Sequence, residues 1–291
     1  MRLVIVSGLS GSGKSVALDA LEDMGFYCID NVPAALLEGL LIQTIEARDA
    51  LYDNIAVGVD ARNRAADLQS LPGLLDSLKD RGVNCEVLFL HAEDQVLLQR
   101  YRETRRRHPL RTQTMSLQDA ISEERDLLGP IIYAANLVID TTQISIHELR
   151  ENLRSRIGRD DRGLSIQIES FGFKYSVPYD ADFVFDVRCL PNPYWDLQLR
   201  GKNGRDPEII EFLSGSEITE SMYQDILAFL RNRVPEYAQN HRNYLTVAIG
   251  CTGGQHRSVY LAERVAATLR DEHEGVLVRH NQLSQVDDTA G

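Results

Sequence analysis

Residues 8–15 (GLSGSGKS) follow an apolar segment and precede a helix-like one, and they fit the pattern G-x-x-x-x-G-K-[ST] at every fixed position. Glycines let the main chain bend so that its N–H groups surround phosphate oxygens, and the positive end of the next helix points there. Lys14 would reach the β- and γ-phosphates, and Ser15 would ligate Mg²⁺. The sequence therefore predicts a nucleotide-binding loop made of Gly8, Leu9, Ser10, Gly11, Ser12, Gly13, Lys14 and Ser15.

Two carboxylates follow predicted strands near this loop. Asp60 ends the apolar run VGVD, where an acidic residue can hold Mg²⁺ directly or through water and serve catalysis with Lys14. The alternative for Asp60 is an ordinary helix N-cap. If the first role holds, Arg62 and Asn63 would lie near the base or the phosphates. Asp30 would either orient an acceptor hydroxyl, as in small-molecule kinases, or cap the next helix.

A second glycine-rich segment, CTGGQHRS, begins at Cys251. Its spacing matches C-x5-R-[ST], the pattern with which tyrosine-phosphatase-type loops wrap a phosphate. Gly253, Gly254 and Arg257 are therefore predicted to bind an anion. Nucleophilic catalysis by the Cys251 thiolate is the weaker hypothesis, because the phosphatase signature has a histidine where Gly250 stands. A small buried residue is the remaining interpretation of Cys251.

The segment FVFDVRCLPNPYW, residues 183–195, would bring further groups to the Cys251 loop if its strand runs parallel to the strand before that loop. Asp186 would accept a hydrogen bond from a sugar hydroxyl or form a salt bridge with Arg188. Tyr194 and Trp195 would wall a pocket or pack in the core.

Six arginines lie within residues 100–111 (RYRETRRRHPLR). Three interpretations stay open for this stretch: a solvated helix face with salt bridges to Glu93, Asp94 and Glu103, an arginine lid over the nucleotide, or an RNA-contacting patch.

The elements that must position these groups alternate between strand and helix. Strands are predicted at residues 2–7, 26–29, 55–59, 87–90 and 137–139, with helices at 14–24, 33–47, 95–104 and from about 146. This order predicts an α/β fold whose first domain, residues 1–156, is a P-loop kinase-like, doubly wound parallel sheet. The polar segment RSRIGRDDRG, residues 154–163, marks the boundary.

The second domain, residues 164–291, is predicted to be another α/β domain that carries the C-x5-R loop. Its strands are expected at 164–170, where apolar residues alternate, and at 183–187 and 245–249. Helices are expected at about 219–240, with a break before Pro235 as the alternative, and at 258–269.

Composition restricts the class of protein. The net charge is −12, from 31 Lys and Arg against 43 Asp and Glu, which disfavours broad nonspecific nucleic-acid binding. The four cysteines are scattered and fit reduced thiols. No apolar run approaches a membrane span and no leader precedes the first strand, so we expect a cytoplasmic protein without a membrane partner.

Several motifs together resemble the RapZ/YvcJ family of bacterial nucleotide-binding proteins. They are GLSGSGKS, DNVP, VDARN, ESFGFKY, DADFVFDVRCLPNPYW and IGCTGGQHRSVYLAERV, and the resemblance covers about residues 2–280. It implies that the chain binds and slowly hydrolyses ATP and GTP. The ATP loop would be residues 8–15, and the segment assigned to GTP would be Asp60, Ala61, Arg62 and Asn63.

The resemblance also implies a regulatory output. The C-terminal domain would be similar to a phosphofructokinase subdomain and sense glucosamine-6-phosphate, a phosphorylated amino sugar. The residues that would line its pocket are Asp186, Tyr194, Cys251, Thr252, Gly253 and Arg257; position 194 is often histidine in the family. Enterobacterial members present a small regulatory RNA to ribonuclease E, and a homo-oligomer is expected.

The chain departs from the RNA-adaptor members at its end. Those members finish in a basic tail, whereas this chain has Arg279 and His280 followed by two aspartates. Because phosphate contacts dominate RNA affinity, this tail should bind RNA weakly unless residues 100–111 compensate. The alternative function is a small-molecule kinase whose C-terminal loop binds a phosphorylated acceptor.

Overall fold

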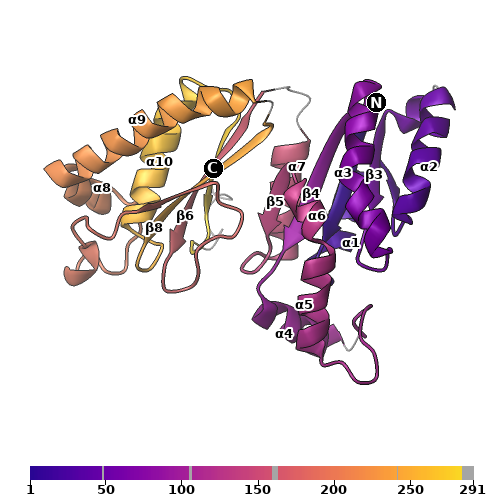
Figure 1. Ribbon diagram of the computed structural model, residues 1–291. Helices are drawn as coiled ribbons and strands as arrows, with labels where there is room; N and C mark the ends of the chain where they lie inside the picture. Colours follow the sequence, from indigo (N-terminus) through magenta and orange to yellow (C-terminus); the bar gives the residue numbers. More distant parts are fainter. Residues whose placement is uncertain (48, 105–106, 159–162, 241, 284–291) are drawn as a thin grey trace. The chain divides into compact units, whose positions relative to one another are not determined.

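The chain forms two compact units, Met1–Arg159 and Asp160–Gly291, which are described separately here. The computed structural model describes residues 1–47, 49–104, 107–158, 163–240 and 242–283 (Figure 1).

The N-terminal unit is built on a parallel sheet in the order β2-β3-β1-β4-β5. Its strands are β1 (Arg2–Gly8), β2 (Tyr27–Ile29), β3 (Asn54–Gly58), β4 (Asn84–His91) and β5 (Leu137–Asp140). The two strands beside the loop of residues 8–15, β1 and β4, are apolar and almost wholly buried, as strands covered on both faces must be.

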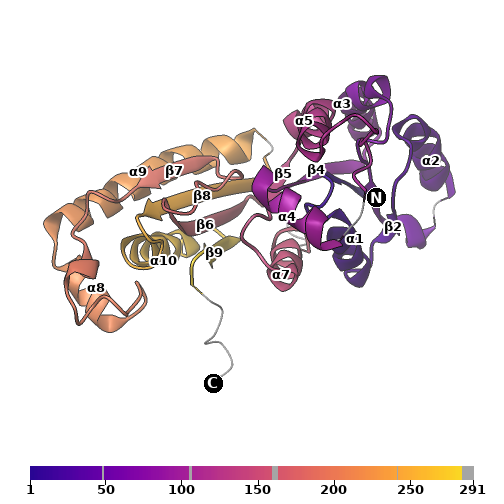
Figure 2. The same ribbon diagram turned by 90° about the horizontal axis from the view of Figure 1, so that it is seen from below.

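Helices cover both faces of this sheet. They are α1 (Lys14–Asp23), α2 (Ala34–Ala47), α3 (Ala65–Asp80), α4 (Asp94–Thr104), α5 (Leu117–Leu127), α6 (Gly129–Tyr133) and α7 (Ile146–Ile157), with a 3₁₀ turn η1 (Ala50–Tyr52). Figure 2 shows α1 and α7 on one side of the strands and α2, α3 and α5 on the other. The predicted doubly wound α/β fold is thereby confirmed.

The strand register brings several loops to one edge of the sheet. Gly8 pairs with Leu90 on one side of β1, and Val6 pairs with Gly58 on the other. The loops that follow β1, β3 and β4 therefore leave the sheet side by side, at the edge where ligands bind in parallel α/β folds.

The C-terminal unit has a second parallel sheet in the order β7-β8-β6-β9. The strands are β6 (Ser165–Gly172), β7 (Phe183–Asp186), β8 (Tyr244–Cys251) and β9 (Val276–His280). Its helices are α8 (Pro207–Ser214), α9 (Glu217–Gln239) and α10 (Arg257–Arg270), with a 3₁₀ turn η2 (Pro193–Trp195). Figure 2 shows α9 and α10 on opposite sides of these strands.

The strand expected at 164–170 is present as β6. It is buried at every position although apolar and polar residues alternate along it, because it is a central strand with a helix on each face. The helix does not break before Pro235 but runs to Gln239. Pro235 lies in the last turns, where its missing N–H removes one hydrogen bond and the apolar stripe ending at Val234 keeps the helix on the sheet.

The sequence patterns missed other elements: α3, α5, α6, α8 and β9. Among the described residues, no helix is long and apolar enough to cross a membrane.

The last strand is fastened by a chain of polar groups that runs from the buried His280 side chain to the exposed Arg205 side chain. His280 of β9 contacts the Ser170 hydroxyl through Nδ1 (2.7 Å) and the Glu263 carboxylate through Nε2 (3.0 Å). Glu263 also accepts a hydrogen bond from Arg205 Nε (2.5 Å). His280 and Arg205 outweigh burial and lower the pKa of Glu263 from 4.5 to about 2.

We predict that Glu263→Gln destabilises the C-terminal unit by about 1–2 kcal/mol at neutral pH. Because the folded-state pKa is below the unfolded one, the ionised carboxylate stabilises the unit above pH 4.5, and this contribution disappears as the pH falls toward 2. Urea unfolding followed by circular dichroism at several pH values measures the difference. The matched control is Glu274→Gln, an exposed glutamate in the turn before β9; a difference that does not change with pH would contradict the prediction.

Candidate functional site

The loop after β1 needs glycine at two of its fixed positions. Gly8 has φ 144°, and a Cβ there would lie 2.3 Å from the carbonyl oxygen of Leu90 on β4. Gly13, directly before α1, has φ 109°. Both conformations are ones that L side chains rarely adopt. No hydrogen bond recorded among the described residues uses the main-chain N–H of Gly13, Lys14 or Ser15, so these donors remain available at the start of α1.

The Lys14 side chain folds back across the loop. Its Nζ donates a hydrogen bond to the Gly8 carbonyl oxygen (2.7 Å). Burial lowers the pKa of Lys14, and the carboxylates of Glu124, Asp60 and Asp30 oppose that shift. The ammonium is therefore placed by its own loop among three carboxylates, where it neutralises negative charge at the candidate phosphate site.

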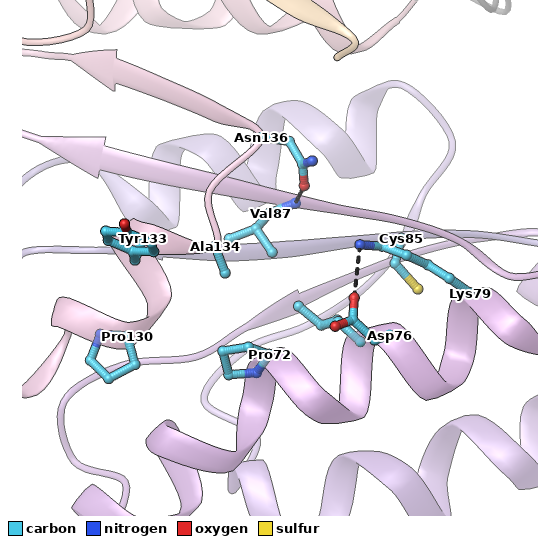
Figure 3. A pocket seen from close by; sticks show the side chains of 10 residues that line it. Pro72, Asp76, Lys79, Cys85, Val87, Pro130, Tyr133, Ala134 and Asn136 are labelled. Atoms are coloured by element: carbon cyan, nitrogen blue, oxygen red, sulfur yellow. Dashed lines mark hydrogen bonds and ion pairs between the residues drawn. The ribbon is translucent and has the colours of Figure 1, made fainter. Parts of the chain in front are cut away.

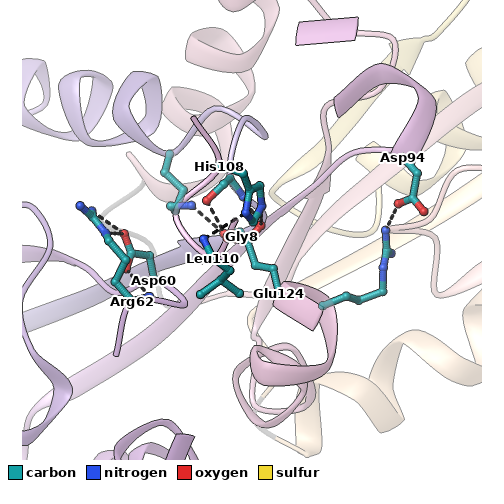
Figure 4. Close-up of polar contacts among 10 residues, drawn as sticks. Gly8, Asp60, Arg62, Asp94, His108, Leu110 and Glu124 are labelled. Atoms are coloured by element: carbon teal, nitrogen blue, oxygen red, sulfur yellow. Dashed lines mark hydrogen bonds and ion pairs between the residues drawn. The ribbon is translucent and has the colours of Figure 1, made fainter. Parts of the chain in front are cut away.

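A buried carboxylate that no motif predicted anchors the loop. Glu124 of α5 is fully buried and accepts hydrogen bonds from the Ser10 N–H (2.9 Å) and the Ser10 hydroxyl (2.6 Å). His108 Nδ1 accepts from the Leu110 N–H, so its Nε2 carries the proton that faces Glu124 at 3.1 Å. Figure 4 shows Glu124 and His108 on one side of Gly8 and the Asp60–Arg62 pair on the other.

The hydrogen bonds explain how Glu124 stays ionised. Burial would raise its pKa, but His108, Lys14 and Ser10 outweigh burial, and the pKa is lowered. The available sequence signal was an acidic residue on the buried stripe of α5, four positions after Ala120.

Arg100 and Thr141 hold the other side of the loop. Arg100 donates to the Gly11 carbonyl oxygen (3.0 Å) and to the Thr141 carbonyl oxygen (2.6 Å). The Thr141 hydroxyl donates to the Ser12 carbonyl oxygen (2.9 Å). None of the three interpretations of residues 100–111 named this role for Arg100.

Asp94 was expected to form a salt bridge with an arginine of residues 100–111, but it pairs with Arg125 of α5 (Figure 4). Residues 105–106 of that stretch lie outside the described residues.

Asp60 is buried but already engaged. Its Oδ1 accepts from the Arg62 N–H (2.9 Å), and its Oδ2 accepts from Arg62 Nε (2.8 Å) and Nη2 (2.6 Å). Burial is outweighed by Arg62, so the pKa of Asp60 is lowered. The N-cap interpretation was wrong, because Arg64 precedes α3 in that position.

The two residues predicted to hold Mg²⁺, Ser15 and Asp60, form only part of a metal site in the structure. Ser15 is exposed at the start of α1, whereas the Asp60 oxygens are bonded to Arg62. No group of three His, Cys, Asp or Glu side chains that could hold a metal occurs in the part of the chain that the structure describes. Mg²⁺ would therefore depend on Ser15 and on the phosphates themselves, with Asp60 contributing through water.

The C-x5-R segment forms a tight loop around the Cys251 sulfur. The Gly254 N–H donates to Sγ at 3.2 Å and the Ser258 hydroxyl lies 3.1 Å from it. Burial raises the pKa of the Cys251 thiol, but these contacts and the N–H groups of Ser258 and His256 outweigh it, so the pKa is lowered. The loop thus has the electrostatics expected for an anion site, with several of its amides directed at the sulfur.

Packing explains why no histidine precedes this cysteine. A Cβ at Gly250 would lie 2.4 Å from the Phe171 ring and 2.6 Å from the Phe173 ring. Gly254, at φ 73°, is similarly restricted: a Cβ there would lie 2.7 Å from the main-chain N of Gly172 and 2.2 Å from Gln282 Oε1. The loop is therefore built against aromatic rings and the chain's last described residues, and it has no room for the phosphatase histidine.

Arg257 positions a neighbouring loop instead of pointing freely at an anion. Its Nη1 donates to the carbonyl oxygens of Arg188 (2.8 Å) and Leu190 (3.1 Å), and Nη2 donates to the Thr252 hydroxyl (3.3 Å). The side chain is buried, and its Nε has no partner among the described atoms. Arg257 thus connects the predicted ligand loop to the loop that carries Tyr194.

Asp186 and Tyr194 lie less centrally than predicted. The strand β7 does run parallel to β8, with Asp186 opposite Gly250. The Asp186 carboxylate is held by Arg188 (2.6 Å), whose hydrogen bonds lower its pKa. Tyr194 and Trp195 are exposed, which corrects the interpretation of core packing, and Arg200 stacks on the Tyr194 ring at 4.5 Å.

A cavity of about 260 Å³ that no motif predicted lies between α3, β4 and α6 (Figure 3). Its lining is Pro72, Leu75, Asp76, Lys79, Cys85, Val87, Pro130, Tyr133, Ala134 and Asn136. Cys85 pairs with Leu3 near the start of β1, whereas the glycine loop follows the end of β1. This cavity is therefore not part of the candidate nucleotide site.

Family comparisons match the whole chain. The family model described as "RapZ-like N-terminal domain" matches residues 1–161, and the one described as "RapZ C-terminal domain" matches residues 164–284. A protein of Methylococcus capsulatus named as a nucleotide-binding protein is 51% identical over 98% of this chain and 97% of its own length. One of Pseudomonas aeruginosa with the same description is 52% identical over 98% of this chain and 100% of its own length.

Solved structures align mainly with the N-terminal half. A shikimate kinase from Bacteroides thetaiotaomicron has a TM-score of 0.37 and 15% identity, over 54% of this chain and 99% of its own. A gluconokinase from Sinorhizobium meliloti has a TM-score of 0.29 and 17% identity, over 52% of this chain and 95% of its own.

We predict that Glu124→Gln lowers nucleotide affinity about tenfold and stability by about 1–3 kcal/mol. The glutamine NH₂ group would face a donor whose hydrogen bond the carboxylate now accepts, so two donors would be opposed and one hydrogen bond lost. Titration calorimetry with ATP and urea unfolding measure the two effects. Glu123→Gln, an exposed neighbour on the same helix, should change neither; equal effects in both variants would contradict the anchoring role.

We predict that Gly250→Ala destabilises the C-terminal unit by about 1–3 kcal/mol, because the two phenylalanine rings must move. Gly253→Ala should stay within about 0.5 kcal/mol, since nothing lies within 4 Å of its Cβ position. Thermal unfolding of both variants tests this, and a Gly250→Ala protein as stable as the wild type would refute it.

Proposed function

This chain belongs to the RapZ family, and from that premise we propose that it is a nucleotide-binding regulatory protein with a separate site for a phosphorylated metabolite. The observation that carries the proposal is the fixed glycine loop, with Lys14 inside it and free N–H groups at the start of α1. The printed names of its relatives, which describe nucleotide-binding proteins, support the same proposal.

The nucleotide is proposed to be ATP or GTP with Mg²⁺. Main-chain N–H groups and Lys14 would hold the phosphates, and Ser15 would contact the metal. The carboxylate of Asp60 is engaged by Arg62 and is not free to take a proton from water. This arrangement supports slow hydrolysis and a role as a sensor.

The proposed metabolite site is the loop around Cys251 and Arg257. A phosphorylated amino sugar, such as glucosamine-6-phosphate, carries the dianion that such a loop recognises. Asp186 ends β7 and Tyr194 follows the loop that Arg257 holds, and we assign contacts with the sugar to both. A small-RNA adaptor role with ribonuclease E, a homo-oligomer and a cytoplasmic location remain proposals from the family resemblance.

The two sites can be tested separately. Lys14→Ala should weaken ATP and GTP binding about 100-fold, because it removes the only lysine in the loop, and it should leave glucosamine-6-phosphate binding unchanged. Arg257→Lys should weaken glucosamine-6-phosphate binding and leave ATP and GTP binding unchanged. A lysine ammonium cannot make the hydrogen bonds that both ends of the Arg257 guanidinium make to the surrounding loops.

Titration calorimetry with each ligand measures both effects, and circular dichroism checks that each variant is folded. If the two folded variants lose both ligands equally, the proposal of separate sites is wrong.

A small-molecule kinase remains the second candidate, favoured by the cavity beside the glycine loop that is described next.

A further inference from the structure

A cavity of about 480 Å³ opens in the N-terminal unit between the loop after β2 and the loop after β3. We call it the acceptor pocket, and its lining residues are Asn31, Pro33, Ala35, Arg62, Asn63, Arg64 and Asp67. It is therefore a hollow of small-metabolite size, lined mostly by polar side chains.

The strand register places this pocket next to the phosphate loop. β3 lies beside β1, with Gly58 opposite Val6, two residues before the loop begins. Asp30 leaves the end of β2 and covers Gly58: a Cβ on Gly58 would lie 2.5 Å from Asp30 Oδ1. The Asp30 carboxylate thus lies between the phosphate loop and the pocket, close enough to Lys14 and Arg62 to affect the pKa of both.

The polar lining suits an anion. The Arg62 guanidinium uses Nε and Nη2 on Asp60, which leaves Nη1 free to donate. The Arg64 side chain is exposed, and no hydrogen bond or ion pair recorded among the described residues uses its guanidinium. The lining holds two guanidinium groups and one carboxylate, that of Asp67, and guanidinium is the group best shaped to hold phosphate.

The pocket's walls are fixed to each other. The Asn63 side chain accepts from the Ala34 N–H (2.6 Å) and donates to the Asp60 carbonyl oxygen (3.0 Å), so it joins the two loops. Asn31 adopts φ 55°, a left-handed conformation, and the next residue, Val32, donates to the Gly58 carbonyl oxygen (3.1 Å). These hydrogen bonds fix the two loops that form the walls of the pocket.

We propose that the acceptor pocket binds a small phosphate monoester that carries a free hydroxyl, and that the N-terminal unit transfers a phosphoryl group to that hydroxyl. The proposal rests on the proposed function, since the glycine loop must hold the nucleotide triphosphate. Arg62 and Arg64 bind the phosphate of the acceptor, and its hydroxyl points toward the loop.

The reaction balances with the nucleotide as the second substrate. The acceptor oxygen forms a bond to the γ-phosphorus, and the bond from that phosphorus to the β,γ-bridging oxygen breaks. The nucleoside diphosphate leaves with the electron pair, and the hydroxyl proton passes to the Asp30 carboxylate. This assigns Asp30 the role of general base, one of the two roles that its position after β2 suggested.

The binding half of the proposal is tested by arginine modification. The full chain is saturated with Mg²⁺ and a non-hydrolysable ATP analogue, then treated with phenylglyoxal with and without inorganic phosphate, and modified arginines are mapped by peptide mass spectrometry. Phosphate should slow modification of Arg64 at least fivefold and leave Arg81, exposed just past α3, unaffected. Equal rates at Arg64 with and without phosphate would overturn the site.

The transfer half is tested with γ-labelled ATP and a panel of sugar phosphates, glycerol phosphate and nucleoside monophosphates. A labelled product is expected from at least one of them, at least 100-fold less with Asp30→Asn, and unchanged with the control Asp23→Asn at the exposed end of α1. Label found only in free phosphate with every compound would refute transfer.

A parallel titration with the ATP analogue distinguishes failure of nucleotide binding from failure of the acceptor pocket. If the wild-type protein does not bind the analogue, the proposed function itself is wrong. Normal analogue binding without phosphate protection of Arg64 would defeat the acceptor pocket alone.

Discussion

The burial of one carboxylate, that of Glu124, constrains much of the N-terminal unit. An ionised carboxylate in a protein interior is tolerated only where hydrogen bonds replace its water. Glu124 obtains them from Ser10 in the glycine loop and from His108, which lies between α4 and α5. The shape of the glycine loop therefore depends on a region more than 100 residues further along the chain, as the separation of Ser10 and Glu124 shows.

The same constraint explains which parts of the candidate site could be predicted from sequence. The glycine loop is local: its glycines, Lys14 and Ser15 act within eight consecutive residues, and a strand and a helix flank it as expected. Contacts made by tertiary packing gave no such signal. Glu124, Thr141 and Arg100 reach the loop from separate elements, and nothing in their local sequence marks them as its partners.

Sequence patterns predicted the fold correctly where apolar runs were long. They missed elements where the run was short or where packing altered the pattern. The strands of the first sheet and the parallel α/β class were predictable, since buried parallel strands are continuous apolar runs. Short elements, α6, α8 and β9 among them, were missed because a segment of five to eight residues shows too little of a helix or strand period to be assigned. In the C-terminal loop the spacing of the motif identified Cys251 and Arg257. Only the structure showed that Arg257 donates hydrogen bonds to the main-chain oxygens of residues 188 and 190.

The strand order of the second sheet also determines when it can be completed. β6 is the first strand of its unit to be synthesised, yet it lies between β8 and β9, the last two. Ser170 and His280, which meet in the finished sheet, are 110 residues apart. While the chain emerges from the ribosome, both edges of β6 stay unpaired until β8 and β9 have been synthesised, so its backbone donors and acceptors are open to mispairing and to chaperones during that time.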